Sequence, residues 1–250
     1  MHKIIKNIFL FFSTAFFLSC ATSGTAHNIK KPPTKSFVKV FHKVSVSSCS
    51  EGTKNCPIGS WMATGSGMAI DLHSEKMTVV TAGHVCHSEM KDFIKEHSQS
   101  VSVMDFNGNV HQAYVVDFSL HNSSGSPDIC ILWVPTLKTE KIQISKKPPQ
   151  IGDELQYIGA PKGVFHPPVV PIFKGIFSGQ ISTAKSILTA PAAGGSSGSA
   201  VLNKNNELVG VLFAVNGQFQ NISLITSYHS SLLFFARARK ELINIDPTGK

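Results

Sequence analysis

Short apolar runs separated by turn-forming residues fill most of this chain and constrain its fold more than any other feature. About a dozen such runs read as β-strands, in two successive sets. The first set is Phe37–Val46, Trp61–Leu72, Met77–Thr81, Val101–Phe106, Val110–Phe118 and Ile129–Val134. The second set is Glu154–Ile158, Val169–Phe177, Ile181–Thr189, Ser199–Asn203, Leu208–Val215 and Asn221–Ser227. Strands and helices do not alternate, so the pattern argues against a doubly wound fold.

Only two segments have helical character, Cys86–His97 and Ser230–Ile243, and the second has an apolar and a charged face. The stretch Lys146–Pro149 separates the two sets of strands and reads as a connector. We therefore predict an all-β fold of two antiparallel six-stranded barrels with a C-terminal α-helix. The predicted unit covers residues 37–245, with the first barrel at about 37–140 and the second barrel together with the helix at about 150–245.

The N-terminal segment reads as an export signal. Lys3 and Lys6 precede an apolar run, Ile8–Leu18, which is too short to span a bilayer. The sequence Phe17–Cys20 resembles the lipobox of bacterial lipoproteins, although that family usually has Leu where Phe17 stands. We predict a signal peptide at 1–19, a lipid on Cys20 and a flexible tether at 20–36. The expected location is periplasmic or on the cell surface, on a bacterial membrane; signal cleavage after residue 21 or 26 is the alternative.

Cysteine usage fits an exported protein. Without Cys20, an even number of cysteines remains: Cys49, Cys56, Cys86 and Cys130. Three pairings are possible. Cys49 and Cys56 flank a turn-rich stretch and would staple a hairpin tip, which would leave Cys86 to pair with Cys130.

Zinc is the alternative use of Cys86, since His84 and His87 lie beside it. No second Cys or His pair with ligand spacing follows, so disulfides are favoured. We expect neither a metal nor another cofactor.

Positive charge is spread along the chain. Lys and Arg number 23 against 15 Asp and Glu, which gives a net charge of +8. The basic residues form no stripe interleaved with aromatic residues, so a solvated surface is favoured over nucleic-acid binding.

Three short motifs bear side chains that could act together in catalysis. They are Val79–His84, with a histidine at the end of a strand, Ser126–Leu132, with an acid before one, and Gly194–Val201, with a serine in a glycine-rich turn. A serine hydroxyl needs a general base, which His84 can supply, and Asp128 can orient the imidazole. The chain order is His84, Asp128, Ser197, with successive members 44 and 69 positions apart.

The three motifs together resemble those of the trypsin/chymotrypsin-like serine proteases: Thr-Ala-Ala-His, Asp-Ile-Ala-Leu and Gly-Asp/Asn-Ser-Gly-Gly-Pro. The segment Gly65–Ile70 is similar to a strand of the Htr-type proteases and glutamyl endopeptidases, and Gly159–Gly163 with Gly175–Gly179 is similar to the Htr-type second barrel. The resemblance implies a serine endopeptidase that acts on proteins or peptides through an acyl-enzyme. We expect a monomer.

The resemblance also assigns the remaining site residues. The backbone N–H groups of Gly195 and Ser197 would form the oxyanion hole. The base of the substrate pocket would be Pro191, and its walls would be Ala192, Ala193, Phe213, Ala214, Val215 and Ser223. None of these carries a carboxylate, so small or apolar substrate side chains are expected. Trypsin-like zymogens have Asp where this chain has Ser196, so activation through that residue is not expected.

Other functions fit the sequence less well. The stretch Gly194–Gly198 also fits a nucleophile elbow with Ser196 as nucleophile, but His229 follows too closely to complete an α/β-hydrolase triad. Asp117, the nearest rival acid, lies within a predicted strand. The main rival from another class is a catalytically silent protein that keeps the trypsin-like fold for binding or adhesion.

Overall fold

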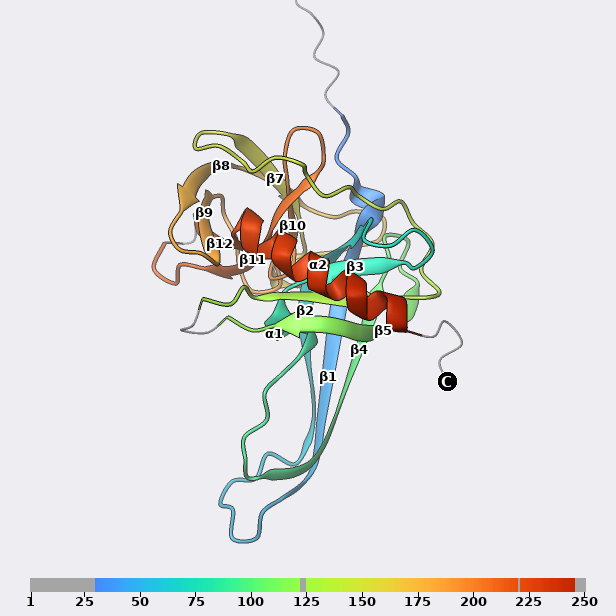
Figure 1. The fold of residues 1–250 in the computed structure, drawn as a ribbon. Helices are drawn as coiled ribbons and strands as arrows, with labels where there is room; N and C mark the ends of the chain where they lie inside the picture. Colours follow the sequence, from blue (N-terminus) through green and yellow to red (C-terminus); the bar gives the residue numbers. More distant parts are fainter. Residues whose placement is uncertain (1–29, 122–124, 220, 246–250) are drawn as a thin grey trace, which may run out of the picture.

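The computed structural model describes residues 30–121, 125–219 and 221–245 and contains two closed antiparallel barrels (Figure 1). The predicted signal peptide, the lipidation site Cys20 and most of the tether lie outside these residues. Within the described part of the chain, the helices are too short or too polar to cross a membrane.

The first barrel closes in the order β1-β2-β3-β6-β5-β4. Its strands are β1 (Phe37–Cys49), β2 (Gly59–Ile70), β3 (Thr78–Thr81), β4 (Ile94–Met104), β5 (Val110–Ser119) and β6 (Ile129–Trp133). Along β1 the side chains of Val38, Val40, Val44 and Val46 are buried, while most of those between them are more exposed. This period of two is what a strand with one face on the core requires.

The second barrel closes in the order β10-β11-β12-β9-β8-β7. Its strands are β7 (Glu154–Ile158), β8 (Ile172–Gln180), β9 (Lys185–Thr189), β10 (Ala200–Leu202), β11 (Leu208–Val215) and β12 (Ile222–Thr226). Every residue of β10 is buried, as is most of β11. The predicted fold class is therefore confirmed.

The C-terminal helix α2 (Tyr228–Asn244) packs on both barrels. Its N-terminus is capped by Ser227, whose hydroxyl accepts a hydrogen bond from the Ser230 N–H. Phe234 and Phe235 are buried in one apolar cluster with residues of both barrels, such as Ile131 and Leu202. The helix therefore holds the two barrels together through a shared core.

The helix predicted for Cys86–His97 is wrong. The short helix α1 (Gly83–Cys86) ends where the predicted helix begins, and Ile94 already starts β4. Strand β4 pairs with β1 along its length, from Ile94 opposite Cys49 to Met104 opposite Lys39. This distant pairing satisfies the backbone of 94–104 and outweighs the local preference for helix.

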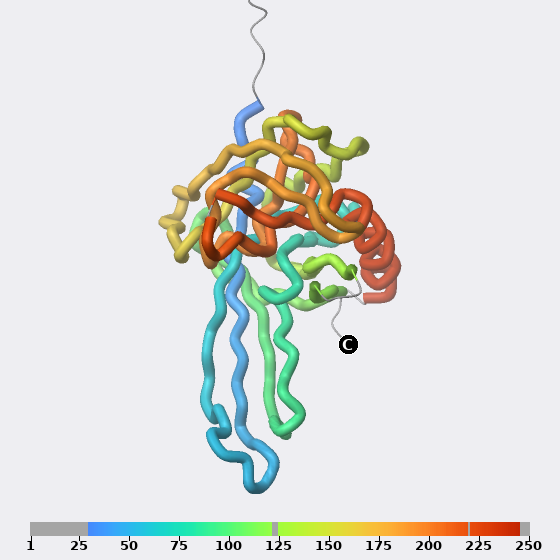
Figure 2. The backbone as a smooth tube through the Cα atoms, turned by 90° about the vertical axis from the view of Figure 1, so that its left-hand side faces the viewer, coloured from blue at the N-terminus to red at the C-terminus, as the bar shows by residue number. Residues whose placement is uncertain are grey.

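Strands β1, β2 and β4 extend beyond the barrel as an arm, which we define as residues 43–62 and 94–100 (Figure 2). The disulfide Cys49–Cys56 closes the loop between β1 and β2 at the tip of the arm. A tight turn at 105–109 joins β4 to β5, and the Asp105 carboxylate accepts hydrogen bonds from the Asn107 and Asn109 N–H groups.

Candidate active site

The predicted base His84 lies in α1, directly after β3. The first residue of this helix is Gly83. A Cβ at this position would lie 2.1 Å from the Ser119 carbonyl oxygen, so only glycine fits. The side chain of His84 is 45% exposed, which leaves the imidazole accessible to a substrate.

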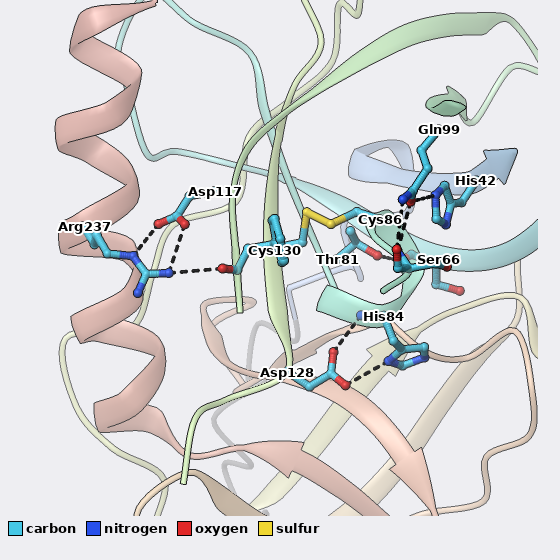
Figure 3. Close-up of a disulfide and its surroundings, with 12 residues drawn as sticks. His42, Ser66, Thr81, His84, Cys86, Gln99, Asp117, Asp128, Cys130 and Arg237 are labelled. Carbon is cyan, nitrogen blue, oxygen red and sulfur yellow. Dashed lines mark hydrogen bonds and ion pairs between the residues drawn. A yellow bond between two sulfur atoms is a disulfide. The ribbon is translucent and has the colours of Figure 1, made fainter. Parts of the chain in front are cut away.

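Asp128 precedes β6 and holds His84 at two points (Figure 3). Its Oδ1 accepts a hydrogen bond of 3.0 Å from the His84 backbone N–H, and its Oδ2 lies 2.9 Å from His84 Nδ1. The carboxylate can only accept, so the Nδ1–H tautomer of a neutral imidazole fits this contact. That tautomer leaves a lone pair on Nε2, as a general base requires.

A disulfide lies beside this pair. Cys86 and Cys130 are bonded, and they follow His84 and Asp128, respectively, by two positions (Figure 3). In the barrel, Cys130 pairs with Thr81 across β3 and β6. The bridge therefore links the elements that carry His84 and Asp128. Both predicted disulfides are present, and Cys86 is not free to bind zinc.

Ser197 lies in a tight turn before β10. Gly198 has a φ of +89°, and a Cβ there would lie 2.0 Å from the Ser66 carbonyl oxygen. Ser197 Oγ donates a hydrogen bond of 3.4 Å to the Phe213 carbonyl, the only bond the structure gives this hydroxyl within its described residues. A direct bond to His84 is not formed here. Catalytic hydrogen bonds often tighten only once substrate is bound.

The N–H groups of Gly195 and Ser197 are left free by the hydrogen bonding around them. The Ser196 N–H donates to the Ala193 carbonyl (2.9 Å) and Gly195 has a φ of +96°, as in a type II turn. The Gly194 carbonyl accepts from the Lys162 N–H (2.6 Å). Across the residues described, Gly195 N–H and Ser197 N–H donate to no protein acceptor. Two such donors beside a nucleophile can bind an oxyanion.

The predicted pocket residues lie around the second barrel. Pro191 is exposed, whereas Ala192 is buried among core residues of that barrel. The walls Ala193, Ala214 and Val215 are half-buried, and Phe213 packs against the core of the first barrel. Ser223 is buried, and its hydroxyl donates to the Ala190 carbonyl (2.9 Å).

The two alternative site residues are occupied elsewhere. Asp117 accepts two hydrogen bonds from the Arg237 guanidinium, at 2.6 and 2.9 Å, and so joins β5 to α2. Ser196 is fully buried, and its side chain forms a hydrogen bond with the Tyr157 hydroxyl. Burial raises the pKa of Tyr157 to about 12, although the hydrogen bond with Ser196 acts in the opposite direction. Neither side chain is available to a substrate in the way that His84 is.

Comparison with known proteins decides the family. Residues 65–211 match the model of the trypsin-like peptidase domain, which is more than half of the chain. The chain belongs to this family.

Solved protease structures share this fold. The Rv3671c protease from M. tuberculosis in its active form matches with a TM-score of 0.59 and 18% identity, over 82% of each chain. Its inactive form matches with a TM-score of 0.57 and 17% identity, over 82% of this chain and 90% of that one. The serine endoprotease from Yersinia pestis matches with a TM-score of 0.59 and 20% identity, over 83% of this chain and 64% of that one. Family and fold together make this protein a peptidase.

Proposed function

We propose that this protein is a serine endopeptidase in which Ser197 is the nucleophile, His84 the general base and Asp128 the residue that orients it. The observation that carries the proposal is the two-point contact between Asp128 and His84, because it fixes both the position and the tautomer of the imidazole. The two free N–H groups beside Ser197 support it.

The chemistry would follow from these positions. Ser197 Oγ bonds to the carbonyl carbon of the substrate while its proton passes to His84 Nε2. The carbonyl oxygen becomes an oxyanion, which the Gly195 and Ser197 N–H groups stabilise; one such donor is typically worth about 3 kcal/mol. The tetrahedral species then breaks its C–N bond, and the leaving amine takes the proton from His84. Water repeats the sequence on the acyl-enzyme and releases the acid.

The site would act outside the cytoplasm and close to a membrane if Cys20 is lipidated, as its lipobox-like sequence predicts. Both disulfides support an oxidising compartment. Proteins or peptides with a small or apolar side chain before the cut bond are the proposed substrates, because no carboxylate stands among the proposed pocket residues.

A fluorophosphonate probe tests the proposal, since it labels only an activated serine. We expect labelling and peptide hydrolysis in the native protein and almost none after Ser197→Ala or His84→Ala, because the triad acts as a unit. The neighbouring Ser196→Ala is the matched control and should keep most of the activity. Loss in Ser196→Ala alone would mean that the nucleophile is misplaced, and absence of both readouts in the native protein would favour the silent binding protein.

A further inference from the structure

The side chain of Ser66, a residue of β2 in the first barrel, contacts the loop that contains the proposed oxyanion hole. Its Oγ donates a hydrogen bond of 2.8 Å to the Gly195 carbonyl and accepts one of 2.9 Å from the Ala160 N–H. Ser66 is fully buried. A carbonyl oxygen can only accept, so the single hydroxyl proton of Ser66 is committed to Gly195.

The backbone of Ser66 also contacts this loop, because its N–H donates to the Ser197 carbonyl (2.8 Å). One residue of the first barrel therefore holds the carbonyls of both residues whose N–H groups would bind the oxyanion. Thr81 fixes Ser66 in turn, since its hydroxyl donates to the Ser66 carbonyl (2.8 Å; Figure 3 shows both residues).

Ala160 connects Ser66 to a second contact of this loop, the hydrogen bond between Lys162 and Gly194. It precedes Lys162, whose N–H holds the Gly194 carbonyl and so turns the Gly195 N–H the opposite way, because the two groups belong to one trans peptide. Ser66 Oγ bonds to both the Ala160 N–H and the Gly195 carbonyl. It therefore connects the segment that contains Lys162 to the residue whose N–H Lys162 orients.

We infer that Ser66 is a positioning residue of the oxyanion hole: its hydroxyl holds the Gly195 carbonyl, directly after the Gly195 N–H, and so helps to keep that N–H turned toward the substrate oxygen. The inference rests on the proposed serine-protease function. Replacing Ser66 by Ala would leave the Gly195 carbonyl and the buried Ala160 N–H without this partner, which gives the loop a reason to shift. His84, Asp128 and the Ser197 hydroxyl would be untouched.

The test compares Ser66→Ala with Thr78→Val. Thr78, in β3, is also fully buried, and its hydroxyl donates a 2.8 Å hydrogen bond to the Ile70 carbonyl in β2, the strand that contains Ser66. Its loss therefore matches the cost of a buried bond away from the loop. Both variants are assayed at a temperature at which they are folded. For Ser66→Ala we expect kcat to fall at least about tenfold, short of the 10²- to 10³-fold that complete loss of one donor costs, with little change in KM.

A peptide aldehyde gives a readout that general destabilisation would not move. Ser197 Oγ adds reversibly to the aldehyde carbon, the serine proton passes to His84, and the aldehyde oxygen enters the oxyanion hole. The peptide alcohol of the same sequence has no carbonyl group, so Ser197 cannot add to it and no oxyanion forms. In Ser66→Ala the aldehyde should lose at least about tenfold in affinity while the alcohol binds as before, since only the first uses the hole.

Several outcomes would overturn the inference. Native kcat and aldehyde affinity in Ser66→Ala, equal losses in Thr78→Val, or equal losses for aldehyde and alcohol would each do so. If Ser66→Ala does not fold, Ser66→Cys replaces it, because a thiol of similar size is a weaker donor and should give an intermediate kcat. A native protein without turnover would refute the proposed function instead, so the two failures are distinguishable.

Discussion

Removal of the disulfide Cys86–Cys130 should cost far more than removal of Cys49–Cys56. Cys86 and Cys130 are both buried in the core of the first barrel, and each lies two residues beyond a member of the proposed triad. The other bridge lies at the tip of the arm, far from the core (Figure 2). The perturbation is the paired substitution of each bridge by alanine.

The expected magnitudes follow from the loops that the bridges close. Cys86 and Cys130 are 44 residues apart, and closing a loop of that size removes about 4 kcal/mol of unfolded-state entropy at 25 °C in the chain-entropy model. Cys49 and Cys56 are 7 residues apart, which gives about 2 kcal/mol as an upper value. The arm tip can also open locally, which lowers its share of global stability further. Domains have only about 5–15 kcal/mol in total, so the first loss is severe.

Urea unfolding measures the free energy of both double variants, and peptide hydrolysis measures their activity. We expect Cys86→Ala/Cys130→Ala to unfold at a much lower urea concentration and to lose activity while still folded, because the bridge links the elements that carry His84 and Asp128. The variant at the arm tip should remain fully active. Equal losses of stability in both variants, or a greater loss at the arm tip, would refute the reasoning.

Three further measurements test other parts of the molecule. Peptide-library profiling should find small or apolar side chains before the cut bond, and a clear preference for Lys or Arg would contradict the pocket assignment. Cys20→Ala should release the protein from membranes or block its processing, and unchanged membrane association would mean that the lipobox interpretation is wrong. Stability should fall as the pH falls below about 6.5, because the pKa of His42 is lower in the folded protein than in the unfolded chain, which therefore takes up the proton first. Burial lowers this pKa; the hydrogen bond with Gln99 offsets part of the shift, and the charge of His87 adds to it. His42→Gln should flatten urea midpoints measured between pH 5 and 8; the same slope in both proteins would assign the effect to other groups.

The sequence was sufficient for the barrels because each strand carries its own apolar pattern. Glu154–Ile158 and Leu208–Val215 end where they were predicted to end. Cys86–His97 was misjudged because the partner of β4 is β1, more than forty residues earlier in the chain, and no local pattern records that pairing. A non-local ladder can override a local preference for helix.

In the candidate site, too, local motifs could be predicted from the sequence and distant contacts could not. His84, Asp128 and Ser197 stand in short motifs at strand ends, so the sequence could nominate them. The role inferred for Ser66 could not be predicted, because its side-chain partners lie 94 and 129 residues away in the second barrel. The motif around Ser66 was visible, but which groups its hydroxyl would meet depends on how the barrels pack.

The geometry of the proposed triad therefore depends on two kinds of contact. His84 and Asp128 are held within the first barrel, where β3 pairs with β6, so their relation is set by one sheet. Ser197 belongs to the second barrel, and its position relative to His84 is set by contacts between the barrels. Besides the hydrogen bonds of Ser66, these include the shared apolar core and the α2 helix, which Arg237 ties to the first barrel. Because a misplacement of about 1 Å can cost about a hundredfold in rate, the packing between the barrels would be as much a part of the proposed catalysis as the three side chains themselves.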